Sequence, residues 1–168
     1  TLGLSQQPQL WRILGGAAVL AVGLPALQLT AISPDAFSLP SGLDDLEAAL
    51  REVEHKSRLI LMQLLRDDLA TNLVVVAVLP ALLEEFFFRG LLQNTLRRLV
   101  SVHAAIWIAA FIFSFIHFQF LGFFYRMLLG ALFGYFYVWS GSIWPAVAGH
   151  LLNNTLGVLA IYGVHHWG

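Results

Sequence analysis

The chain has 168 residues, of which 58% are hydrophobic and 11% are charged, and its mean hydropathy is +0.75. Soluble domains have roughly 45–50% apolar and about 25% charged residues, so this composition indicates a membrane protein. The absence of cysteine excludes disulfides, thiol nucleophiles and thiolate metal sites. The formal net charge is −1 and the few basic residues are scattered, which argues against nucleic acid as a partner.

The N-terminal part of the chain combines an apolar run with an amphipathic segment. Residues 13–32 are apolar and about long enough to cross a bilayer, and because only Arg12 precedes them we do not interpret them as a cleavable signal peptide. Downstream, apolar residues recur at three-to-four spacing, which is typical of an amphipathic helix: Leu43, Leu46, Leu50, Val53, Ile60 and Leu64. Its opposite face is charged. We therefore expect this helix outside the hydrocarbon, packed on the rest of the protein, on lipid headgroups or on another copy of the chain.

Four further apolar runs follow, at 69–96, 102–116, 123–139 and 143–163, which makes five candidate spans in all. Gly130 and Gly134 have the small-xxx-small spacing that lets membrane helices approach closely. The sequence thus predicts an all-α fold, a polytopic transmembrane helical bundle with an amphipathic extramembrane helix. We expect residues 1–68 to form the N-terminal membrane helix and the amphipathic helix, and residues 69–164 to form a helical catalytic core.

Two adjacent carboxylates, Glu84 and Glu85, lie inside the second run. An ionisable group at membrane depth costs at least ~2.5–3.5 kcal/mol, so such a group usually belongs to a functional site. Arg89 follows Glu85 by four residues, the spacing at which the two side chains meet on one helix face. Glu84 has no cation nearby in sequence and is a candidate general base. The alternative is that both carboxylates only join helices through buried salt bridges.

Two later runs carry histidines with a companion four residues away. Phe113 and His117 share one helix face, and His150 and Asn154 share another. A rise of ~1.5 Å per residue puts His117 level with Glu84 and puts His150 nearer the membrane surface by one or two turns. We expect tilt, or an inward position of the turn at 140–142, to close that gap. The other four histidines, at 55, 103, 165 and 166, receive no chemical role.

The three motifs together resemble those of a known family. Glu84 to Arg89 matches EExxxR, Phe113 to His117 matches FxxxH, and His150 to Asn154 matches HxxxN, in the order and spacing of the CPBP intramembrane proteases. That family includes CAAX prenyl endopeptidases and the Abi proteins linked to bacteriocin processing and self-immunity. The resemblance implies that Glu84 with His117 activates water, that His150 and Asn154 stabilise the oxyanion, and that Glu85, Arg89 and Phe113 support the site.

The resemblance favours an intramembrane glutamic endopeptidase in a prokaryotic cell membrane, integral and multi-pass, that cuts a membrane-associated peptide or protein. A prenylated CAAX or bacteriocin-type substrate fits, and self-association stays open. A non-catalytic scaffold or bacteriocin-immunity-type protein is the main alternative. A transporter with a Glu/His proton relay is disfavoured because no inverted repeat is present.

The sequence leaves metal dependence open. Glu84, His117 and His150 could together hold Zn²⁺. The HExxH helix of zinc peptidases is missing, however, and asparagine is a better oxyanion donor than zinc ligand. We therefore expect no cofactor.

Overall fold

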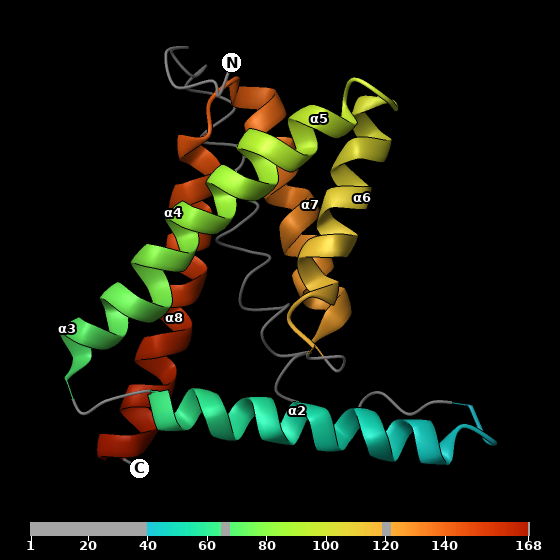
Figure 1. Ribbon diagram of the computed structural model, residues 1–168. Helices are drawn as coiled ribbons and strands as arrows, with labels where there is room; N and C mark the ends of the chain where they lie inside the picture. The colour runs from blue at the N-terminus through green and yellow to red at the C-terminus, as the bar shows by residue number, and fades with distance from the viewer. Residues whose placement is uncertain (1–39, 65–67, 119–121, 168) are drawn as a thin grey trace.

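The computed structural model describes residues 40–64, 68–118 and 122–167, and the regular elements within those ranges are all helical. The prediction of an all-α bundle is confirmed. The predicted first span, 13–32, lies outside the described residues. Figure 1 shows two helix pairs standing side by side, one formed by the long helix and α8 and the other by α6 and α7, with α2 across one end. The bounds are α2 Asp44–Leu64, α6 Val102–Phe115, α7 Phe123–Ser140 and α8 Trp144–Trp167.

One continuous helix of 28 residues runs from Leu69 to Leu96 and carries both carboxylates. Among the described residues it is the helix that is long and apolar enough, by length and composition, to cross a membrane. Asp68 begins it, because its carboxylate accepts hydrogen bonds from the first free backbone N–H groups, those of Ala70 and Thr71. The predicted helix over 69–96 is therefore confirmed.

Two stretches of wider, π-type turns interrupt this long helix. Its successive parts are α3 Leu69–Asn72, η2 Leu73–Val78, α4 Leu79–Glu85, η3 Phe86–Gln93 and α5 Asn94–Leu96. The first π stretch immediately precedes the turn that contains Pro80, a residue with no N–H to donate and a ring that crowds the carbonyl four residues earlier. The second begins directly after Glu85. Stretches of π-helix are rare and frequently mark functional sites.

Helices α6 and α7 pack at close range through glycine. A Cβ added at Gly130 would lie 3.2 Å from Cα of Ala110, and one added at Gly134 would lie 2.9 Å from Oε1 of Gln93 and 3.0 Å from Cγ2 of Ile106. Any larger residue would push the helices apart. The predicted role of the two glycines as a close-packing face is confirmed.

The turn that joins α7 to α8 lies inside the protein. Gly141 closes α7 in the left-handed region, with φ of 67°, and its N–H bonds the carbonyl of Tyr137. Ser142 and Ile143 are almost fully buried. Ser140 satisfies this buried turn by donating to the carbonyl of Phe136 and accepting from the N–H of Ser142. As a result α8 starts within the bundle, and its polar residues lie deeper than its position in the sequence suggests.

Helix α2 lies across one end of the bundle (Figure 1). Its predicted helical structure is confirmed. Apolar side chains on it remain exposed, among them Leu46 and Ile60, which are 49% and 58% exposed. The orientation suits a helix in the plane of a membrane surface. The described residues that pack against it leave this apolar face uncovered.

Candidate active site

The first component of the site is a buried ion pair between Glu85 and Arg89. Nε of Arg89 lies 2.9 Å from Oε2 of Glu85, and the exposed fractions of the two side chains are 2% and 0%. The N–H does not point at the oxygen, so the contact is electrostatic rather than a directed hydrogen bond. The predicted i,i+4 pairing of Glu85 and Arg89 is therefore observed, in a fully dry environment.

Arg89 is held in place by the backbone and rings of neighbouring helices. Its Nη2 donates a 2.8 Å hydrogen bond to the carbonyl of Gly130 on α7. The guanidinium carbon lies 5.4–5.9 Å from the ring centroids of three phenylalanines, Phe88, Phe113 and Phe133. Such cation–π contacts partly replace the water that a buried cation loses. The ion pair thus ties the long helix to both α6 and α7.

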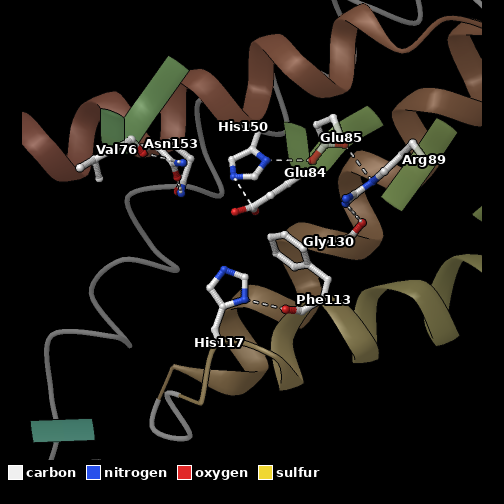
Figure 2. Close-up of polar contacts among 10 residues, drawn as sticks. Val76, Glu84, Glu85, Arg89, Phe113, His117, Gly130, His150 and Asn153 are labelled. Atoms are coloured by element: carbon white, nitrogen blue, oxygen red, sulfur yellow. Dashed lines mark hydrogen bonds and ion pairs between the residues drawn. The ribbon is translucent and has the colours of Figure 1, made fainter. Parts of the chain in front are cut away.

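His150 on α8 connects the two carboxylates (Figure 2). Its Nδ1 lies 2.8 Å from Oε1 of Glu85, and its Nε2 lies 3.7 Å from Oε2 of Glu84. Because Glu85 is paired with Arg89 and accepts, the network assigns a proton to Nδ1 and directs Nε2 at Glu84. The ring also stacks on Phe133, with centroids 5.4 Å apart and planes 19° apart. These contacts allow the imidazole one orientation.

The position of His150 corrects the depth estimate made from helical rise. That estimate put His150 one or two turns nearer the membrane surface than Glu84, whereas the two side chains are in contact. The expected means of closing this gap are both present: the turn at Ser140 to Ser142 is buried, and the long helix runs obliquely to α8 (Figure 1).

Glu84 differs from its neighbour in every respect that matters for chemistry. Its side chain is 29% exposed, against 0% for Glu85. Within the described part of the chain its Oε2 is buried and accepts no hydrogen bond. One carboxylate is thus fixed by a guanidinium and an imidazole, while the other faces an imidazole nitrogen and keeps an oxygen available.

His117 approaches from the opposite side of the site. It follows the last turn of α6, and Figure 2 shows its ring extending toward the Glu84 carboxylate. Its Nδ1 donates a 2.6 Å hydrogen bond to the carbonyl of Phe113, which leaves Nε2 as an acceptor. The Phe113 ring lies 4.9 Å from the His117 ring and 5.8 Å from that of His150. Phe113 is therefore the apolar spacer between the two imidazoles.

Asn154 lies one helical turn beyond His150 on α8. Its Nδ2 donates to the carbonyl of Val76 at 3.2 Å, and its Oδ1 accepts from Nδ2 of Asn153 at 3.1 Å. The predicted residues from three motifs are thus gathered along one side of α8, with His117 across from them. His103, to which we gave no role, bonds the hydroxyl of Tyr135 away from this group.

The donor set does not fit a metal ion in this arrangement. Across the residues that the structure describes, no three His, Asp or Glu side chains lie close enough together to hold one. Glu84, His117 and His150 do not form such a group within the described ranges. Whether a metal takes part stays a prediction.

Sequence reasoning missed several residues that shape this site. Phe133 stacks on His150 and also contacts Arg89, but nothing distinguishes it among thirteen phenylalanines. Side-chain patterns in the sequence could not predict the hydrogen bonds that the backbone carbonyls of Gly130 and Val76 accept. Tyr125 bonds Oδ1 of Asn153, 28 residues away in sequence, and no spacing rule connects the two.

Comparison with known proteins places this helical bundle and its Glu/His cluster in a class of membrane peptidases. A family model described as type II CAAX prenyl endopeptidase Rce1-like matches residues 66–156, a range that contains all three motifs. No curated protein matches the chain, and no solved structure does. The chain belongs to the type II CAAX prenyl endopeptidase Rce1-like family. It is accordingly a membrane protein and a CAAX-type peptidase, with a peptide or protein as substrate.

Proposed function

We propose that this protein is a multi-pass intramembrane endopeptidase in which Glu84 is the general base for attack of water on a peptide carbonyl. The observation that carries the proposal is the contrast between the two carboxylates. Oε2 is buried without a hydrogen bond in both, but that of Glu85 lies 2.9 Å from Nε of Arg89, whereas that of Glu84 faces Nε2 of His150 at 3.7 Å on a side chain that is 29% exposed. A base must have such an acceptor within reach of water.

In the proposed reaction a water molecule is held between Glu84 and Nε2 of His117. Glu84 takes one proton of the water as its oxygen bonds the carbonyl carbon, and the carbonyl oxygen becomes an oxyanion. His150, through Nε2, and Asn154, through its amide, donate to that oxyanion, usually the largest electrostatic contribution in acyl transfer. The proton on Glu84 then passes to the amide nitrogen and the C–N bond breaks to give a carboxylic acid and an amine; the acid passes its remaining proton to the amine, and a carboxylate and an ammonium leave.

The supporting residues keep this geometry rigid. Glu85 holds His150 by Nδ1, so that Nε2 stays directed at the reacting atoms. Arg89 pairs with Glu85, and Phe113 separates the two imidazoles. The family name suggests a prenylated C-terminal CAAX segment as substrate, and we propose a membrane-associated peptide of that kind.

The test compares purified wild type with Glu84→Gln on matched reporter peptides, one prenylated and one not. Glutamine keeps the shape of the side chain but cannot accept the proton, so cleavage should be nearly abolished while the melting temperature stays close to that of wild type. Retained cleavage would refute the role of Glu84. A wild-type protein that binds the peptides but cleaves neither would favour the scaffold or immunity alternative.

A further inference from the structure

The carbonyl group of Val76 lacks the donor that a regular α-helix would supply. In an α-helix the N–H of the residue four positions later bonds each carbonyl, and for Val76 that residue is Pro80, which has no N–H. Val76 lies in the first π stretch, where a carbonyl is within reach of the N–H five positions later, and Pro80 removes only the α-helical donor. A donor from another helix also reaches this carbonyl, since Nδ2 of Asn154 on α8 lies 3.2 Å from its oxygen.

A chain of hydrogen bonds continues from Asn154 to α7. Nδ2 of Asn153 donates to Oδ1 of Asn154 at 3.1 Å, and the hydroxyl of Tyr125 donates to Oδ1 of Asn153 at 2.5 Å. The carbonyl of Val76 fixes the direction of every bond in this chain, because a backbone carbonyl can only accept. Nδ2 of Asn154 must therefore face Val76, its Oδ1 must face Asn153, and the oxygen of Asn153 is left for Tyr125.

This directionality matters because an asparagine side chain can rotate by half a turn at little cost unless its partners forbid it. A carboxamide has two N–H groups. One N–H of Asn154 is used by Val76, and the other is available to a substrate oxygen. After a half turn the side chain would present its own oxygen to the oxyanion, which would repel it.

We propose that Tyr125, Asn153 and the Val76 carbonyl form an orienting relay that holds the Asn154 amide with one N–H free for the oxyanion, and that Pro80 contributes by removing the α-helical donor that would compete for this carbonyl. The inference rests on the proposed function for the role of Asn154 itself. Tyr125 and Asn153 are positioning residues, which act through Asn154 and do not touch the substrate.

The first test is Tyr125→Phe, with Tyr135→Phe as the matched control. Tyr135 lies on the same helix and loses a comparable bond, to His103 at 3.0 Å, but has no link to Asn154. Loss of one relay bond should lower kcat about 5–10-fold and leave KM unchanged, since one hydrogen bond contributes about 1 kcal/mol. The control should keep wild-type kcat. A loss confined to KM, or an equal loss in the control, would overturn the relay.

A double-variant cycle separates positioning from general structural damage. Asn154→Ala alone should lower kcat about 10²–10³-fold, as loss of an oxyanion donor does. Adding Tyr125→Phe to that variant should lower kcat no further, because Tyr125 then has nothing to orient. Losses that multiply would show that Tyr125 acts independently of Asn154.

A measurement that does not depend on catalysis tests the relay separately from the proposed function. The side-chain amide resonance of Asn154 in ¹⁵N–¹H spectra, assigned by its absence in Asn154→Ala, should shift in Tyr125→Phe and stay in place in Tyr135→Phe. An unshifted resonance in Tyr125→Phe would refute the relay whatever the activity. If wild type cleaves no peptide, the proposed function fails and the resonance still measures the relay.

Pro80→Ala tests the other end of the relay. Alanine restores an N–H at position 80, which competes with Asn154 for the carbonyl of Val76 when this turn takes the α-helical register. The long helix should melt no earlier than in wild type, while kcat falls and the Asn154 amide resonance shifts. A variant with unchanged kcat and an unshifted resonance would remove Pro80 and Val76 from the relay.

Discussion

Replacing Glu85 by glutamine should destabilise the protein strongly, although the two side chains have nearly the same shape. The carboxylate holds Arg89 with one oxygen, at 2.9 Å, and His150 with the other, at 2.8 Å. A glutamine offers one oxygen and one NH₂ group. In either orientation of the glutamine amide, its NH₂ group faces another donor, on Arg89 or on His150. Arg89 also loses its compensating charge.

The expected cost follows from the burial of the pair. Breaking a fully buried ion pair by removing one partner costs about 3–5 kcal/mol, because the remaining charge stays desolvated. For a chain of this size each kcal/mol corresponds to roughly 2–4 °C of melting temperature, so Glu85→Gln should melt roughly 6–20 °C lower. Arg89 cannot escape to solvent, since it is enclosed by rings and bonded to the carbonyl of Gly130.

Thermal unfolding in detergent, followed by circular dichroism, provides the measurement. Glu52→Gln is the matched control, because Glu52 pairs with Lys56 at the same i,i+4 spacing and 3.1 Å but with side chains 60% and 68% exposed. An exposed pair of this kind contributes about 0–1 kcal/mol, so the control should melt within a few degrees of wild type. Equal melting of Glu85→Gln and Glu52→Gln would refute the account of the buried pair.

Gly134→Ala should destabilise by about 1–3 kcal/mol, because the new methyl group would lie 2.9 Å from Gln93 and 3.0 Å from Ile106; Gly157→Ala, with no atom within 4 Å of the new Cβ, should melt no lower than wild type. Hydrogen bonds from the side chain and then the backbone of Thr71 hold the pKa of Asp68 below its ordinary value. A lowered pKa in the folded state stabilises the helix start above the unfolded pKa, and this stability is lost as pH falls through the folded pKa. The protection factors of the Ala70 and Thr71 amides, which correct for the intrinsic pH dependence of exchange, should therefore fall on acidification, and Asp68→Asn should remove that dependence. Cleavage should survive exhaustive chelation with metal well below one ion per chain; activity lost with stoichiometric zinc and restored on its return would contradict metal-free chemistry.

The fold followed from local patterns wherever the sequence carries a local cause. The apolar run at 69–96 contains Pro80 and a charged pair. It still forms one helix, because the wider π-type turns accommodate the proline. Gly130 and Gly134 predicted the closest helix contact correctly, since only small residues permit it. The division of the chain at residue 68 stays a prediction, as does the number of spans.

The site was predictable in its residues but not in its connections. The spacing of Glu85 and Arg89 gave their pairing, because both lie on one helix. Helical rise alone left His150 too shallow and needed tilt or an inward turn to bring it to Glu84, and its hydrogen bond to Glu85 was not predicted. The links from Asn154 to Val76 and from Asn153 to Tyr125 join residues 78 and 28 positions apart, which no periodicity connects. The catalytic roles themselves stay predictions.

The arrangement of His150 between two carboxylates has a consequence for electroneutrality. Glu84 and Glu85 bring two acidic groups, and Arg89 and His150 bring two basic groups, into one cluster. Net charge is costly at membrane depth, and the equal numbers of acidic and basic groups limit it. In the proposed attack the site gains a proton from water while the substrate gains an oxyanion, so the total charge does not change. The peptidase would thus cross its barrier by redistributing charge over a few ångströms, without drawing a counter-ion into the bilayer.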